Sequence, residues 1–133
     1  MLLPPVAMAE PVDALRAAAL AGDAEAQARL GSRLYRGDGV PRDLVAAFRW
    51  LLRAAEQGSV TAQTGLAVLY YNGEGTPQHL VEALKWALIA ADSGDADAAR
   101  HRDYLLQRLA PHQVREARRL ATAWVPKPEP ANR

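Results

Sequence analysis

Residues 22–57 read GDAEAQARLGSRLYRGDGVPRDLVAAFRWLLRAAEQ, and residues 58–93 read GSVTAQTGLAVLYYNGEGTPQHLVEALKWALIAADS. The second segment repeats the first without a gap, and fifteen positions are identical at an offset of 36 residues. Self-similarity at a fixed period of about 20–50 residues is typical of stacked repeats, in which each unit buries its apolar face on the next. The period therefore predicts a repeat architecture, which favours binding functions over catalysis.

Each unit is predicted to form a helix, a glycine loop and a second helix. A glycine can close one helix in the left-handed conformation, and a following Asp or Ser can cap the next helix. This arrangement recurs as Gly22-Asp23, Gly58-Ser59 and Gly94-Asp95. We expect first helices at about 24–35, 60–71 and 96–109, and second helices at about 43–57 and 79–93. The second helices carry apolar residues at the i, i+3, i+4 spacing of a buried helix face.

The two ends of the chain depart from the repeat, as the caps of a solenoid do. Residues 10–21 align with the second helix of a missing earlier unit, and a final helix is expected at 111–124. The prediction is one all-α domain, 10–125, with about seven helices. It comprises a half-unit (10–21), repeats 22–57 and 58–93, and a degenerate repeat with a capping helix (94–125). The proline-rich tail, 126–133, is expected to be extended and disordered.

Composition excludes several classes of partner. Sixteen basic and fifteen acidic residues nearly cancel, so no overall field would recruit nucleic acid or an anionic membrane. There is no cysteine, which excludes disulfides and thiolate chemistry. No apolar run approaches the ~18 residues that span a bilayer. We therefore predict neither a nucleic-acid partner nor a membrane span.

The N-terminal residues 1–9 are apolar and end in Ala7-Met8-Ala9, an A-x-A pattern. This resembles the end of a secretory signal with cleavage after Ala9, although a positively charged start is missing. Residues 1–9 are thus either a signal-peptide remnant or a disordered segment. A periplasmic or exported location and a cytoplasmic location both stay open.

Candidate chemical groups have simpler structural explanations. The two glycine loops hold an acidic residue and lack the Lys of a phosphate-binding loop. His79, His101 and His112 do not share a helix face at the spacing of metal ligands. Trp50 and Trp86 occupy the same repeat position, which indicates inter-helix packing. We predict no catalytic, cofactor-binding or metal-binding residue, and no cofactor.

The last third of the chain is locally basic. From residue 100 onward, the helices expected at 96–109 and 111–124 carry Arg100, Arg102, Arg108, Arg115, Arg118 and Arg119 against Asp103 and Glu116. A solvated helix face explains this cluster, and a site for an acidic partner is the alternative.

Three motifs carry a family resemblance: Ala-Gln-x-x-Leu-Gly from Ala26, Tyr-x-Gly-x-Gly-Val-Pro from Tyr35, and Ala-Phe-x-Trp-x-x-x-Ala-Ala-x-Gln-Gly from Ala47. They resemble Sel1-like repeats, relatives of the tetratricopeptide repeat with a longer glycine-containing loop. The resemblance implies a right-handed α/α solenoid, often bacterial, of the kind that acts as an adaptor in signalling, secretion and envelope processes. His79 departs from the acidic residue that the family usually places at the start of the second helix, which should weaken one cap.

By the same resemblance, a partner would lie across the first helices of successive units, on the concave face. The exposed groove positions are expected to include Ala28 and the following residues: Glu25, Ser32, Tyr35, Arg36, Thr61, Thr64, Val68, Tyr71, Asn72, Asp97, Arg100, Tyr104, Gln107 and Arg108. As an alternative, Tyr35 and Tyr71 pack beneath the glycine loops.

Three functions follow as hypotheses. The first is a non-catalytic interaction module that binds a peptide or helix of a partner protein in its concave groove. The second is a self-assembling regulatory scaffold, so that the chain is a monomer or a weak homo-oligomer. The third is a hydrolase or cell-wall enzyme, an activity assigned to some relatives, but the sequence shows no convergent titratable cluster that would carry it.

Overall fold

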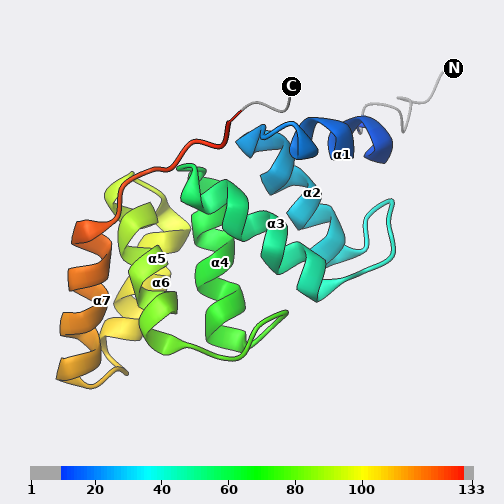
Figure 1. The fold of residues 1–133 in the computed structure, drawn as a ribbon. Coiled ribbons are helices and arrows are strands. Elements are labelled where there is room, and N and C mark those ends of the chain that lie inside the picture. Colours follow the sequence, from blue (N-terminus) through cyan, green and yellow to red (C-terminus); the bar gives the residue numbers. More distant parts are fainter. Residues whose placement is uncertain (1–9, 131–133) are drawn as a thin grey trace, which may run out of the picture.

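The computed structural model describes residues 10–130, and this part of the chain forms seven α-helices and no strand. Figure 1 shows α1 (Val12–Leu20), α2 (Ala24–Arg36), α3 (Leu44–Glu56), α4 (Val60–Asn72), α5 (Leu80–Asp92), α6 (Ala96–Leu106) and α7 (Pro111–Ala123). Each helix from α1 to α5 packs on the next along the chain, and α7 packs on α5. The predicted all-α solenoid is confirmed. The expectations for residues 1–9 and 131–133 lie outside the described residues.

Side-chain caps start the helices where the repeat predicts them. Asp23 accepts hydrogen bonds from the backbone N–H groups of Glu25 and Ala26 at 3.0 and 3.2 Å. Ser59 and Asp95 cap α4 and α6 in the same way. His79 is the N-cap of α5, and its Nδ1 accepts from the N–H of Glu82 at 3.2 Å. A neutral imidazole nitrogen has the required lone pair, so His79 keeps the cap bond and loses only the negative charge.

A buried glutamine in each repeat ties one hairpin to the preceding helix. Gln27 is fully buried, and its side-chain amide donates to the backbone carbonyl of Ala19 at 3.0 Å. Gln63, 36 residues later, donates to the carbonyl of Ala55 at 3.2 Å. The last carbonyls of a helix lack intrahelical partners. These two carbonyls already accept from the N–H groups of Gly22 and Gly58, so the repeated glutamine adds a second hydrogen bond that ties the start of one helix to the end of the preceding one.

α6 ends at Leu106, earlier than the expected end at residue 109. Pro111 disfavours the helical conformation at Ala110, which is extended. The chain turns before reaching it, and Leu109 is buried against α5 and α7.

The second glycine loop approaches α3 closely. Gly75 has φ +73°, and a Cβ placed there would lie 2.1 Å from the backbone oxygen of Leu44. Gly39, its counterpart in the first loop, has φ +75°, and its Cβ would meet only a methyl of Val12 at 3.6 Å. The two glycines therefore share one backbone requirement, but only Gly75 leaves no room for a side chain.

Gly75→Ala is expected to lower the free energy of unfolding much more than Gly39→Ala. Both changes cost about 1–2 kcal/mol for the left-handed conformation. Gly75→Ala adds an overlap with α3 that costs a further ~1–3 kcal/mol. Urea unfolding of the two variants measures the difference, and equal losses would contradict this account of the loop.

The tail differs from the expected disordered segment over residues 126–130. It runs from α7 back across the helix ends towards α1, as the red segment of Figure 1 shows. The N–H of Lys127 donates to the carbonyl of Glu56 at 2.7 Å. Arg53 binds both carboxylate oxygens of Glu129, at 3.1 and 2.7 Å. The prolines do prevent a helix, but fixed hydrogen bonds hold this extended segment against α2 and α3.

We expect the tail to leave the helices in acid. The hydrogen bond from Arg53 lowers the pKa of Glu129 below 4.5, and Gln27 adds to this effect. Because the docked form has the lower pKa, docking is at full strength above pH 4.5 and weakens as the pH falls through the depressed pKa. The NMR amide signal of Lys127 should move towards that of a free peptide in this range. Glu129→Gln should remove the pH dependence; a wild-type signal that stays constant until the helices melt would contradict the prediction.

Candidate functional site

The first helices of the three units, α2, α4 and α6, leave two hollows between them. The hollow between α2 and α4 has a volume of about 260 Å³, and the one between α4 and α6 about 290 Å³. Val68 lines both hollows, which therefore adjoin. We call this continuous surface the first-helix groove. The first hollow is lined by Ser32, Tyr35, Arg36, Leu51, Thr61, Gly65, Val68 and Leu69, and the second by Ala67, Val68, Tyr71, Asn72, His101, Tyr104 and Leu105.

Eight of the predicted groove residues line these hollows: Ser32, Tyr35, Arg36, Thr61, Val68, Tyr71, Asn72 and Tyr104. The other six, on the same helices or just after α6, do not line them: Glu25, Thr64, Asp97, Arg100, Gln107 and Arg108. Several of the six are engaged elsewhere. Thr64 donates to Asp95 at 3.0 Å, and Asp97 pairs with Arg100 on the surface of α6.

The floor of the groove is apolar. Leu51 and Leu69 are buried beneath the first hollow, and Leu105 lies beneath the second. Gly65 opens the first hollow, because a Cβ there would touch Leu51 at 3.4 Å. The expectation for Ala28 is wrong: it is only 2% exposed, because its small side chain packs in the core with Leu51. Projection along the first helices missed Leu51 because it belongs to a second helix, whereas Leu69 and Leu105 lie on first helices but were not among the expected groove positions.

Tyr71 and Tyr104 form the rim of the second hollow, and Arg108 stacks on Tyr104. The hydroxyls of Tyr71 and Tyr104 lie 2.9 Å apart, and their rings meet edge to face at 5.6 Å. The guanidinium of Arg108 lies 3.5 Å from the centre of the Tyr104 ring. These contacts fix the rings without filling the hollow. Tyr71 thus lines the groove, where it contacts Tyr104 of α6.

Tyr35 links the groove to the next repeat. Its hydroxyl donates to the carboxylate of Glu74, in the second glycine loop, at 3.1 and 3.3 Å. Arg42 lies over the Tyr35 ring at 5.6 Å and 3.8 Å from Glu74. Burial raises the pKa of Tyr35, and the bond to Glu74 raises it further. For Tyr35 both interpretations hold, because it lines the first hollow and also contacts a loop.

A third hollow lies on another side of the last helices. It has a volume of about 880 Å³ and is lined by Leu88, Ile89, Asp92, Ser93, Arg102, Asp103, Leu106, Arg118, Ala121, Thr122 and Trp124. It is open and carries charges of both signs. Arg102 pairs with Asp103 at 2.9 Å, and Arg119 pairs with Glu116 at 2.6 Å. Much of the basic surface expected on these helices is therefore neutralised locally, which weakens the case for an acidic partner there.

The part of the chain that the structure describes holds no group of three or more His, Asp or Glu side chains placed to bind a metal ion. Of the helices within residues 10–130, none is long and apolar enough to cross a membrane. The contacts in the groove are phenol–phenol, phenol–carboxylate and cation–ring contacts. Such contacts orient side chains around an apolar floor.

The repeat sequence and the fold both have known relatives. The sequence model described as "Sel1 repeat" matches residues 24–59 and 60–95, more than half of the chain. A protective antigen from uropathogenic Escherichia coli with an SLR fold aligns with a TM-score of 0.82 and 32% identity over 85% of this chain. A Sel1 repeat protein from Oxalobacter formigenes aligns with a TM-score of 0.65 and 35% identity over 70% of this chain. This chain spans 24% and 26% of those two chains. A search of curated proteins finds no significant match.

The hydrogen bond between the hydroxyls of Tyr71 and Tyr104 raises the pKa of Tyr71 above 10.0, because it favours the neutral phenol. The hydrogen bond between Tyr71 and Tyr104 therefore stabilises the folded chain below pH 10.0, and this stabilisation is lost as the pH rises through the raised pKa of Tyr71. Tyr104→Phe is therefore expected to lower the pKa of Tyr71 towards 10.0. NMR of the ring carbons measures this value. Tyr70 is an internal control: burial raises its pKa to about 12, which Tyr104→Phe should leave unchanged. An unmoved Tyr71 would show that the pair does not share this bond in solution.

Proposed function

This chain belongs to the Sel1 repeat family, and from that premise we propose that its first-helix groove binds a peptide or helix segment of a partner protein. The Sel1 repeat fold commonly mediates protein–protein interaction. The observation that carries the proposal is the pair of adjoining hollows, with a floor of Leu51, Leu69 and Leu105 and a rim of hydrogen-bonded tyrosines. An apolar floor with fixed aromatic rims provides the anchors that dominate binding energy in protein interfaces.

The size of the groove limits the kind of partner. The combined volume of its two hollows is enough for only a few side chains of one segment. Stable interfaces between folded domains usually bury about 1,200–2,000 Å². A single extended strand or one amphipathic helix, which inserts side chains at regular intervals, therefore fits better than a large folded surface.

We further propose that the chain acts without catalysis. The family is generally a non-catalytic repeat scaffold. The phenols, hydroxyls and guanidinium groups around the hollows make contacts that position side chains, as expected of a binding surface.

Val68→Glu is expected to weaken binding of the partner at least about tenfold, because it places a charge at the point that both hollows share. Val45→Glu is the matched control, since Val45 is 51% exposed on α3 and lines neither hollow. The partner is first captured from the native cell by crosslinking to the wild type and identified. Its affinity for the wild type and both variants is then measured with purified proteins.

Both variants must first match the wild type in helical content and melting. Equal affinities for the two variants would rule out the groove. Light scattering over the same concentrations tests the alternative of self-assembly: a mass that grows with concentration for the wild type, but not for Val68→Glu, would mean that a second copy is the partner.

A further inference from the structure

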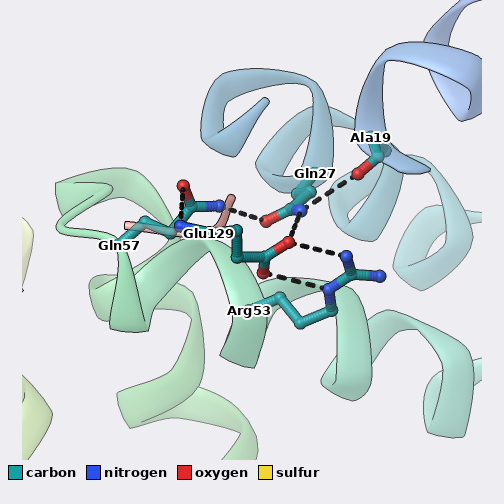
Figure 2. Close-up of polar contacts among 5 residues, drawn as sticks. All are labelled: Ala19, Gln27, Arg53, Gln57 and Glu129. Atoms are coloured by element: carbon teal, nitrogen blue, oxygen red, sulfur yellow. Dashed lines mark hydrogen bonds and ion pairs between the residues drawn. The ribbon is translucent and has the colours of Figure 1, made fainter. Parts of the chain in front are cut away.

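Residues 126–130 lie in a site whose contacts resemble those of a bound peptide. Figure 2 shows the carboxylate of Glu129 between Arg53 and Gln27. Arg53 donates to both carboxylate oxygens, and the buried side-chain amide of Gln27 donates to one of them at 3.1 Å. Gln57 accepts from the backbone N–H of Glu129 at 3.4 Å and donates to Gln27 at 2.9 Å. Together these groups recognise both the side chain and the backbone of one acidic residue.

The backbone of the segment follows the repeat. Pro126 lies beside Gly58, at 3.7 Å from where a Cβ would be, and Pro130 lies beside Gly22 at 3.4 Å. These glycines are equivalent positions of successive units. A proline-rich strand rises about 3.1 Å per residue, so the four steps from Pro126 to Pro130 carry the chain roughly 12 Å along the helix ends. Prolines on both sides of Glu129 hold the strand extended, which reduces the entropy lost on docking.

The charged part of this site is not required by the repeat. The position equivalent to Arg53 is Ile89 in the second unit, and the position equivalent to Gln57 is Ser93. The helices of the second unit pack without that arginine and glutamine. Arg53 also lies over the Trp50 ring at 4.7 Å, but the second unit forms its hairpin with neither residue, so their hydrogen bonds to the tail are specific to the first unit.

We propose that Gln27, Arg53 and Gln57 form a recognition site for an extended segment with a carboxylate between prolines, and that the chain's own tail covers this site until a partner segment of the same chemistry displaces it. The site lies at the helix ends and shares no residue with the first-helix groove. The two can therefore be tested separately.

A second copy of the chain is less suited than a partner to supply the segment. The tail leaves α7 at Trp124, whose ring packs on the buried Trp86 at 5.8 Å. Lys127, three residues later, is already bound to Glu56. Three residues reach at most about 11 Å, so a second copy would have to bring its own α7 close to α3 and α5 of the first. A free segment of a partner has no such restriction.

The test uses the full chain with Glu129→Lys, which places a cation beside Arg53 and releases the tail. A peptide with the sequence of residues 125–133 is added while NMR follows the side-chain amides of Gln27 and Gln57. We expect saturable shifts of both amides. The wild-type chain should bind the peptide at least about tenfold more weakly, because its own tail competes at high effective concentration. A peptide that carries Glu129→Gln should bind to the Glu129→Lys chain at least about tenfold more weakly than the unchanged peptide does, as expected when a charge-assisted pair is lost.

Two further variants of the full chain are controls. Glu116→Lys makes the same charge change on α7, where Glu116 contacts Arg119, and should bind the peptide like the wild type. Adding Arg53→Ala to Glu129→Lys should remove the binding.

Four results would overturn the proposal. The first is a Lys127 amide signal in Glu129→Lys that stays at its docked position. The second is a released tail without peptide binding, or with binding equal to that of the wild type. The third is shifts at Val68 and Tyr71, which would assign the peptide to the first-helix groove. The fourth is a wild-type dimer that Glu129→Lys abolishes, which would make a second copy the source of the segment.

Discussion

The close approach of neighbouring helices through alanine is the constraint on which this structure depends. Ala19, Ala54, Ala55 and Ala90 have no exposed surface and lie near the ends of α1, α3 and α5. Ala19 and Ala55 are equivalent positions of the repeat, and so are Ala54 and Ala90. A larger side chain at any of them would separate two helices, since protein interiors are packed too tightly to absorb added volume. The same spacing places the amide of Gln27 within hydrogen-bond distance of the Ala19 carbonyl. Helix spacing and the helix-end hydrogen bond are thus parts of one arrangement, repeated every 36 residues.

The sequence predicted the features that are local or periodic. Glycine followed by Asp or Ser fixes where one helix ends and the next begins, so the helix boundaries could be placed within a few residues. The groove was predicted less completely. Tyr35, Val68 and Tyr71 project from first helices at the expected places, but the floor includes Leu51, which belongs to a second helix. Which side chain closes a hollow depends on how two elements cross, and the period of one helix does not contain that information.

Features that break the repeat were beyond the sequence prediction. Trp50 and Trp86 occupy equivalent positions, yet Trp86 is 1% exposed against Trp124, whereas Trp50 lies partly exposed beneath Arg53 at 4.7 Å from its ring centre. The difference arises because the Trp124 ring, which follows α7, packs on Trp86 in the second repeat, whereas no aromatic ring packs on Trp50 within the described residues. The tail is a similar case: composition identifies an extended strand, but the partners of Glu129 lie 72 to 102 residues away in the sequence.

A comparison of Gln27 with Gln63, its equivalent in the second repeat, shows why the tail can undock while the helices stay folded. In the second repeat, Oε1 of Gln63 is buried and accepts no hydrogen bond within the described part of the chain, because Ser93 replaces the glutamine that would reach it. In the first repeat, Gln57 donates to Oε1 of Gln27, and Nε2 of Gln27 donates to both Ala19 and Glu129. When Glu129 leaves, Gln27 keeps a partner for its amide nitrogen and another for its oxygen. The large cost of an orphaned buried polar group, about 1–3 kcal/mol, is therefore avoided. The helix-end bond to Ala19 survives, so a segment that replaces the tail meets a site that is already formed.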